Sequence, residues 1–280
     1  MSSSEVLGLI AGRGSLPLEV ARSARGQGRP VAAIGFHGQT DPKLAEEAEI
    51  TWLHPGEVGA ALAALRDSGV SEAVMAGKVP KVGLYADPAA LRPDAEALAL
   101  LSNLRDRRDD SILAALANWL EERGIRLLGQ AELVPGLVGG EGPLGQTALD
   151  PKQRADVAFG FPIAKTIAGL DIGQTVVVKD GAVLAVEAIE GTDAAIRRAG
   201  QVGEGACVVK VAKPRQDPRF DMPAIGLDTL AAMLEAKASA LAFEAGRSLV
   251  LERAALVQAA DGHGIALVGV AAERLPAEEA

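Results

Sequence analysis

The stretch VLGLIAGRGSLPLEVARSARGQGRPVAAIGF, residues 6–36, decides the fold class of this chain. Residues 6–11 form a short apolar run, as in a buried strand, and a Gly-Arg-Gly-Ser turn follows at once. Residues 16–26 predict a helix, with Ser15 as its N-cap, a proline in its first turn and glycine at its end. Residues 31–36 predict the next strand. Strand, tight turn, helix and strand in this order indicate a parallel sheet covered by helices.

The same alternation runs through the first half of the chain and then stops. Further strands are predicted at residues 50–53, 72–76 and 125–128, and helices at 56–68, 95–104 and 111–122. Residues 137–149 (LVGGEGPLGQTAL) are rich in glycine and lack periodicity, which predicts a linker. We therefore expect α/β architecture with a Rossmann-like parallel-sheet domain at residues 1–136 and a second domain at residues 150–280.

The second half predicts a mixed α/β domain. A helix is expected at residues 151–170, followed by a hairpin at 175–187 (TVVVKDGAVLAVE) whose Asp180-Gly181 pair supplies the turn. A tight hairpin forces an antiparallel pair, so the sheet must contain both strand directions. Further strands are predicted at residues 207–211, 241–244, 248–251 and 265–270, and helices at 191–199, 227–238 and 252–260.

Composition excludes several classes of protein. The chain has 280 residues, 49% hydrophobic and 23% charged, which is typical of a globular protein. Aromatic residues make up 3% and the net charge is −9, so general nucleic-acid binding is disfavoured. The single cysteine, Cys207, excludes an intramolecular disulfide and is expected to be buried. The N-terminus has no basic leader, and no apolar run reaches transmembrane length, so we expect a soluble cytoplasmic protein.

Residues 208–226 (VVKVAKPRQDPRFDMPAIG) carry the strongest functional signal. An apolar strand ends there in a loop whose interleaved prolines prevent a helix and stiffen the backbone. A rigid loop with cations and carboxylates at a strand end suits a site for phosphate and a metal ion. The alternative is a solvated connection with surface ion pairs. The candidate residues are Lys213, Arg215, Gln216, Asp217, Arg219 and Asp221.

The glycine turn after the first strand is a second candidate. It consists of Gly12, Arg13, Gly14 and Ser15. A turn that opens a helix can hold a phosphate on the helix N-terminal amides. Pro17 replaces the third glycine of the dinucleotide fingerprint, and no carboxylate follows the second strand, which disfavours a nicotinamide oxidoreductase. The alternative is a tight turn that binds nothing.

Two further positions are consistent with an anion site. Lys78 follows a strand and could meet an anion, or could be an ordinary exposed lysine. Thr192 and Asp193 open a helix after a glycine, and they either bind a phosphate or only cap that helix. Scattered histidines and one cysteine make zinc improbable, whereas carboxylates support a hard cation such as Mg²⁺ or Mn²⁺.

Five segments, in one order along most of the chain, resemble a single family: the UDP-2,3-diacylglucosamine pyrophosphatases of the LpxI type, from lipid A biosynthesis. The segments are LIAGRGSLP, MAGKVPK, RRDDSILAAL, VVVKDGAVLAVEAIEGTDAAIRRAG and VVKVAKPRQDPRFDMPAIG. Ala224 stands where the resemblance would place a threonine. The resemblance implies hydrolysis of UDP-2,3-diacylglucosamine to UMP and 2,3-diacylglucosamine 1-phosphate (lipid X) with a divalent cation. It also implies a homodimer of two-domain chains that hold the acylated sugar phosphate between the domains.

The residue types in the loop agree with this chemistry. Pyrophosphate hydrolysis needs cations to offset phosphoryl charge, a metal, and a carboxylate to position water. We expect Asp217 and Asp221 to bind the metal and activate water, and Gln216 to orient the diphosphate. Lys213, Arg215 and Arg219 are expected to face the diphosphate, with the glycine turn, Lys78, Thr192 and Asp193 around the ligand. A diacylated substrate also implies peripheral contact with the inner membrane. The competing hypothesis is a non-catalytic carrier of a nucleotide sugar or lipid, which would not need Asp217 or Asp221.

Overall fold

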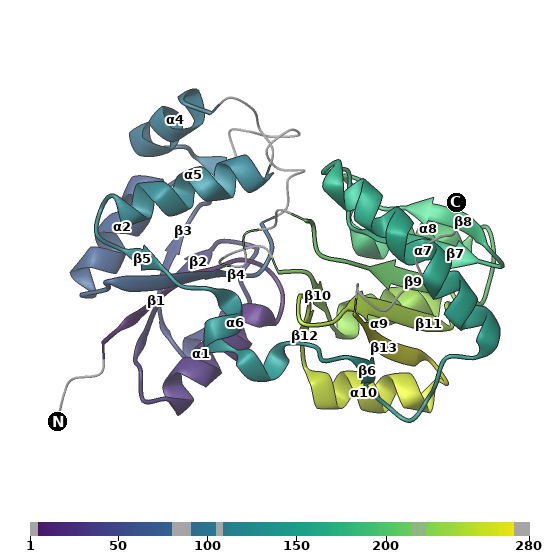
Figure 1. Ribbon diagram of the computed structural model, residues 1–280. Helices are drawn as coiled ribbons and strands as arrows, with labels where there is room; N and C mark the ends of the chain where they lie inside the picture. The colour runs from purple at the N-terminus through teal and green to yellow at the C-terminus, as the bar shows by residue number, and fades with distance from the viewer. Residues whose placement is uncertain are drawn as a thin grey trace. The chain divides into compact units, whose positions relative to one another are not determined.

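The computed structural model describes residues 5–79, 91–104, 109–214, 217, 219 and 222–271. The chain divides into two compact units. The first comprises Met1–Pro135 together with Asp217–Asp221, and the second comprises Gly136–Gln216 and Met222–Ala280. Each unit has a sheet with helices packed on it (Figure 1). The expected α/β fold class, with a parallel sheet first and a mixed sheet second, is confirmed.

The first unit is built on a parallel sheet of strand order β3-β2-β1-β4-β5. Every pair in it is parallel. β1 and β2 are apolar along almost their whole length because they lie inside the sheet with helices on both faces. The strands are β1 (Leu7–Ala11), β2 (Val31–Phe36), β3 (Glu49–Leu53), β4 (Glu72–Ala76) and β5 (Arg126–Leu127).

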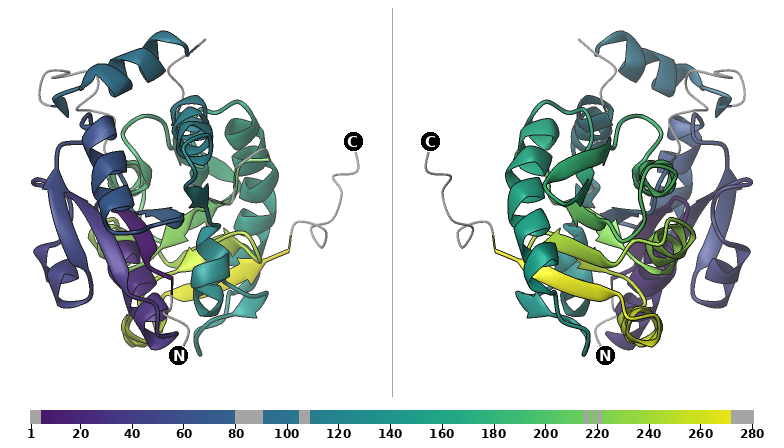
Figure 2. Two further views of the ribbon diagram at one scale, coloured as in Figure 1. Left: turned by 90° about the vertical axis from the view of Figure 1, so that its left-hand side faces the viewer. Right: turned by 90° about the vertical axis from the view of Figure 1, so that its right-hand side faces the viewer.

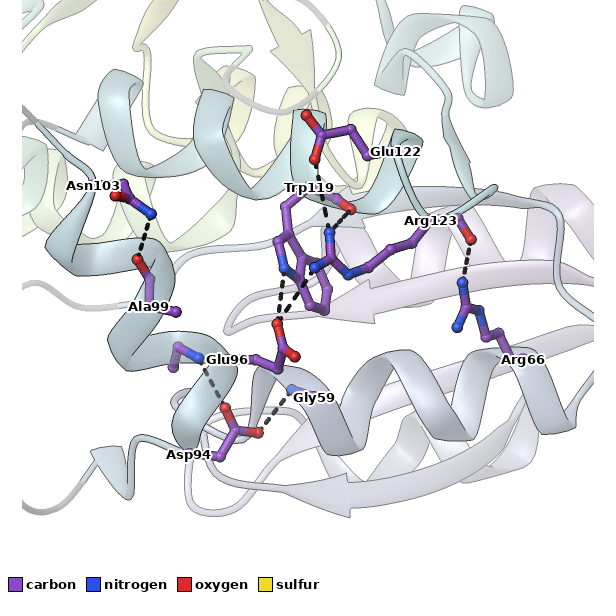
Figure 3. Close-up of polar contacts among 10 residues, drawn as sticks. Gly59, Arg66, Asp94, Glu96, Ala99, Asn103, Trp119, Glu122 and Arg123 are labelled. Atoms are coloured by element: carbon purple, nitrogen blue, oxygen red, sulfur yellow. Dashed lines mark hydrogen bonds and ion pairs between the residues drawn. The ribbon is translucent and has the colours of Figure 1, made fainter.

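Helices cover both faces of this sheet (Figure 1). They are α1 (Leu16–Gly26), α2 (Val58–Asp67), α4 (Ala95–Ser102), α5 (Asp109–Glu121) and α6 (Gln130–Leu133), with 3-10 turns η1 (Pro42–Glu46) and η3 (Pro135–Leu137). Figure 3 shows how α4 is fixed to its neighbours. Asp94 caps α4 at Ala97 N (2.9 Å) and also accepts from Gly59 N of α2 (2.7 Å). Trp119 of α5 donates its indole N–H to Glu96 at 3.2 Å.

The second unit contains a mixed sheet of order β6-β13-β11-β9-β7-β8. β9, β11 and β13 run parallel, while β6, β7 and β8 each pair antiparallel. A separate short parallel pair joins β10 to β12. The strands are β6 (Gly142–Pro143), β7 (Thr175–Lys179), β8 (Ala182–Val186), β9 (Cys207–Lys210), β10 (Ala224–Ile225), β11 (Ala240–Glu244), β12 (Leu249–Val250) and β13 (Ala266–Val270).

Alternate residues of these strands face two separate cores. One core lies against α7 (Pro151–Gly169) and includes Cys207, with strand residues such as Val209 and Ala240. The other lies under α8 (Thr192–Gly200), α9 (Leu227–Glu235) and α10 (Arg253–Gly262), and includes the intervening strand residues. The helices around the sheet can be followed in Figure 2. This period-two alternation explains why the strands read as uninterrupted apolar runs.

Several local expectations are tested directly. The hairpin turn is confirmed, since Asp180 and Gly181 have φ of 49° and 72°. α1 begins and ends where predicted, and Ser15 is its N-cap residue, although the Ser15 side chain makes no capping hydrogen bond. Residues 137–149, where a linker is expected, contain β6, and Gly139 N donates to Ser248 O at 2.8 Å. This glycine-rich stretch therefore forms an edge of the second unit's sheet.

Cys207 is fully buried, as expected. It lies in β9 among the residues that pack against α7. Burial raises the pKa of its thiol to about 12, since the thiolate would lose its hydration there. The thiol is therefore protonated at every physiological pH and acts as a small apolar side chain.

Candidate active site

The turns after β1 and β4 lie against each other at the carboxyl edge of the first sheet. Arg13 N donates to Lys78 O at 2.8 Å, and Lys78 N donates to Arg13 O at 2.9 Å. A Cβ on Gly12 would lie 2.8 Å from Lys78 O, and one on Gly77 would lie 2.7 Å from Arg13 O. Only glycine permits this approach. The chain continues from β1 towards β2 and from β4 towards β5, which lie on opposite sides of this pair in the sheet. Open parallel sheets bind ligands at the carboxyl ends of two such strands.

This edge presents groups suited to an anion. The side chains of Arg13 and Lys78 are exposed there, and the N-terminus of α1 follows directly. Gly14 has a φ of 100°, and a Cβ built on it would meet nothing within 4 Å. The structure therefore brings Lys78 next to Gly12 and Arg13, from which it is distant in sequence, and places Gly14 and Ser15 beside them.

A depression of about 570 Å³ opens beside the glycine turn, over the ends of β2 and β3. His37 stacks on Trp52 with ring centroids 5.9 Å apart, and His54 lies 5.1 Å from His37. Thr40 ties this region to β1 by donating to Ala11 O. No sequence pattern groups these rings, because β2 and β3 pair only in the folded sheet. The lining residues are Arg13, His37, Gly38, Gln39, Thr40, Asp41, Pro42 and Trp52.

Asp217 and Arg219 of the proline-rich loop bind each other. Asp217 accepts from Arg219 N at 3.0 Å and from Arg219 Nη2 at 2.7 Å. This side-chain bond holds the pKa of Asp217 below its ordinary value. Arg219 also pairs with Glu121, the last residue of α5, at 2.7 Å. Arg219 therefore bridges two carboxylates, of which the sequence indicated only Asp217.

Lys213, at the start of the loop, also has a carboxylate partner. Its Nζ lies 2.8 Å from Asp171, just beyond the end of α7. Both side chains are largely buried, at 13% and 23% exposed, so water screens the pair less than it screens a surface pair. Asp171 has a φ of 58°, an uncommon conformation for a residue other than glycine.

Thr192 belongs to a buried polar network behind the loop. Its hydroxyl donates to Glu187 Oε1 at 3.0 Å and accepts from Lys210 Nζ at 3.1 Å. Lys210 also donates to Ala224 O at 2.9 Å, so this lysine holds the end of the loop through its backbone. Thr192, Lys210 and Glu187 are each less than 10% exposed. The hydroxyl of Thr192 is therefore engaged inside the protein, next to the loop.

One carboxylate oxygen of Asp193, the neighbour of Thr192, lacks a hydrogen-bond partner among the described residues. This oxygen, Oδ1, is buried. Asp193 lies in the first turn of α8, where a carboxylate complements the helix dipole.

The remaining predicted loop residues, Arg215, Gln216 and Asp221, lie outside the described residues. Within the described part of the chain, no three histidine, cysteine, aspartate or glutamate side chains gather as a metal site would require.

Charged residues that support the loop from inside were not predicted from the sequence. Lys210 is the one charged residue of β9 (CVVK), and Glu244 is the one charged residue of β11 (ALAFE). Both are buried, at 2% and 3% exposed. A charged residue at the end of an otherwise apolar strand is the sequence feature that indicates such positions, because a buried charge requires a partner.

Comparison with protein families covers both units. The LpxI N-terminal domain matches residues 6–137, and the LpxI C-terminal domain matches residues 140–268. A relative from Caulobacter vibrioides, the UDP-2,3-diacylglucosamine pyrophosphatase LpxI, is 35% identical over 282 residues. That alignment covers 96% of this chain and 99% of the relative.

Solved structures give weaker likenesses. The biotin carboxylase domain of the Hydrogenobacter thermophilus 2-oxoglutarate carboxylase is 13% identical and matches with a TM-score of 0.27, covering 82% of this chain and 40% of that chain. The structure of gox2253 is 14% identical, with a TM-score of 0.27, covering 94% of this chain and 84% of that chain. At these TM-scores the likenesses support no statement about fold or function.

Proposed function

The chain belongs to the LpxI family, and we propose that it hydrolyses UDP-2,3-diacylglucosamine to UMP and lipid X. The observation that carries this proposal is the relative named for this activity, which aligns with 96% of the chain. The activity is that of a pyrophosphatase in lipid A biosynthesis. Water adds across the pyrophosphate bond, so that one phosphate leaves with uridine and the other stays on the sugar.

The described loop residues suit this reaction. Lys213 and Arg219 supply positive charge for the phosphoryl oxygens, and each is held by a carboxylate that fixes its position. Arg219 lowers the pKa of Asp217, so this carboxylate stays ionised at neutral pH. We assign Asp217 and Asp221 to metal binding and water activation, with Gln216 and Arg215 completing the loop. The glycine turn with Arg13 and Lys78, and the α8 start with Thr192 and Asp193, are assigned to substrate binding.

A divalent cation, Mg²⁺ or Mn²⁺, is part of this proposal. Hard cations prefer ionised carboxylate oxygens, and Asp217 offers one. Both oxygens of Asp217 accept from Arg219, so a cation would have to share Asp217 with Arg219 or replace it. When bound, the cation would offset negative charge on the phosphoryl oxygens.

The proposed location of the enzyme in the cell follows from its proposed substrate. Among the described residues, no helix is long and apolar enough to span a bilayer. Because the proposed substrate carries two acyl chains, we propose peripheral contact of a cytoplasmic protein with the inner membrane. We further propose a homodimer, on the basis of the family resemblance.

Chromatography of reaction mixtures tests the function. Purified protein should release UMP from UDP-2,3-diacylglucosamine, EDTA should stop the release, and excess Mg²⁺ should restore it. Asp221→Ala should lower the rate by orders of magnitude while substrate still binds, since the lost charge acts mainly in the transition state. Full activity in metal-free buffer would contradict the cation requirement. Substrate binding without UMP under any condition would favour the carrier instead.

A further inference from the structure

Glu244 ends β11 as a buried carboxylate beside the first residues of the loop. β11 pairs in parallel with β9, and their register places Phe243 beside Lys210. Glu244 therefore lies where β9 leaves the sheet. Glu244 Oε2 accepts from Ala212 N at 2.8 Å and from Lys165 Nζ at 2.9 Å. The Glu244 side chain is 4% exposed and that of Lys165 is 24% exposed, so the carboxylate is buried and the ammonium is partly accessible to water.

Lys165 completes this contact from the other side. It projects from α7 and donates to Ala212 O at 2.8 Å, in addition to its ion pair with Glu244. The N–H and C=O of Ala212 are thus both bound by side chains of one ion pair. Arg247 extends the set, because its Nη1 lies 3.5 Å from Glu244 Oε1 and its Nη2 donates to Lys213 O at 3.0 Å. Two successive residues at the start of the loop are therefore held by charged side chains.

Stability alone does not account for this ion pair. Removing two charges from water costs several kcal/mol per ion, so a buried pair often contributes no more than two apolar side chains of similar volume. The neighbouring core between β9 and α7 is itself aliphatic. What apolar side chains could not do is bind both polar groups of Ala212. The pair therefore gives this backbone a defined position.

We propose that Glu244 and Lys165 are positioning residues that fix the start of the catalytic loop, and hence the place of the Lys213 ammonium. This inference rests on the proposed function of the loop. The far end of the loop is held independently, because Leu249 N donates to Pro223 O at 2.8 Å and Lys210 holds Ala224 O. Loss of the Glu244–Lys165 pair should therefore release one end of the loop only.

Glu244→Gln tests the proposal, because it keeps the side-chain shape and removes the charge. A small displacement of groups at a reacting centre can cost about 10²-fold in rate. We expect kcat to fall by about that factor while KM changes only severalfold. Lys165→Met should behave alike, and Lys165→Arg, which keeps a charged donor at a partly exposed position, should recover most of the loss.

Asp156→Asn is the matched control. Asp156 is also a buried carboxylate of this unit, but it accepts from Asp180 N and Gly181 N of the β7–β8 turn. It should leave kcat unchanged. Hydrogen exchange followed by mass spectrometry gives a readout that needs no activity. Peptides covering residues 211–214 should exchange faster in Glu244→Gln and Lys165→Met, while in Asp156→Asn only the β7–β8 turn should change.

Each outcome decides the question. Unchanged exchange at residues 211–214 in folded Glu244→Gln and Lys165→Met proteins would overturn the proposal, and so would faster exchange with unchanged kcat. If Glu244→Gln fails to fold, Lys165→Met and Lys165→Arg carry the test at the more exposed partner. Failure of the unmodified protein to release UMP would refute the proposed function, whereas the exchange result would still report whether this pair holds the loop.

Discussion

Asp217 and Arg219, two positions apart in the proline-rich loop, form an ion pair. Asp217 accepts hydrogen bonds from both the backbone and the side chain of Arg219. Arg219 in turn bridges to Glu121. A cation held between two carboxylates loses little further freedom when a phosphate replaces one of them, so in the proposed reaction these pairs would prepare Arg219 for the anionic substrate.

The pH dependence of stability should reveal the Asp217–Arg219 pair. The carboxyl titrates near 3.9 in the unfolded chain, and Arg219 lowers its pKa in the folded one. Its contribution is therefore complete above about pH 5 and is lost as pH falls through the folded-state pKa. Asp217→Asn should be less stable than the unmodified protein at pH 7, and the difference should shrink as the pH falls below the unfolded-state pKa. Urea unfolding across this range measures the difference, with the exposed Asp67→Asn as control. A difference in stability that stays constant as the pH falls from 7 into the acid range would contradict this assignment.

At the scale of the element, the two glycine turns determine how closely β1 and β4 approach at their carboxyl ends. Gly12 and Gly77 each face the carbonyl of the opposite turn. This approach presents Arg13 and Lys78 from neighbouring strands. The packing of two backbones, and not a side-chain contact, thus sets the spacing of these two cations.

Gly12→Ala should destabilise the first unit. The added methyl group would lie 2.8 Å from Lys78 O, and backbone there must move, which costs about 1–3 kcal/mol as in an overpacked core. Gly26→Ala is the control, because the end of α1 has open space and alanine favours a helix by about 0.5–1 kcal/mol. Urea unfolding should show a loss for Gly12→Ala and no loss for Gly26→Ala. Equal stability of the two variants would show that the turns separate without cost.

The elements of this fold could largely be predicted from the sequence, because buried strands read as apolar runs and glycine or proline marks their ends. The short β10 was missed, since Ala224–Ile225 becomes a strand only by pairing with Leu249–Val250. β6 was missed for the same reason, within a stretch rich in glycine.

The candidate site, too, could be predicted from the sequence only in part. The loop residues could be found from local pattern, because cations, carboxylates and prolines follow one another there. Their partners could not: Lys213 binds Asp171, and Ala212 binds Lys165 and Glu244, across long separations that tertiary packing alone decides. The pairing of Arg13 with Lys78 likewise needs the strand order, which no single segment contains.

The charge and apolar content of the chain determine how the protein would reach the proposed lipid substrate. The net charge is −9, which opposes adsorption to an anionic bilayer. Apolar side chains of the described residues lie mostly in the aliphatic cores of the two units. Membrane contact should therefore be weak and local.

Sedimentation tests this expectation together with the proposed dimer. The protein should sediment at about twice the 28.7 kDa of one chain. Added vesicles of anionic phospholipid should leave most of it in the supernatant, because like charges repel. A single-chain mass would contradict the dimer. Quantitative pelleting with vesicles at physiological salt would contradict weak peripheral contact.

The burial of Cys207 has a practical consequence for spectroscopy. Maleimides and other thiol reagents need an accessible thiolate, and this thiol is both enclosed and protonated. The native protein should therefore not react with such labels. A cysteine introduced at an exposed helix position would be the only reactive one, so a fluorophore or spin label can be placed at a chosen site without first removing the native residue.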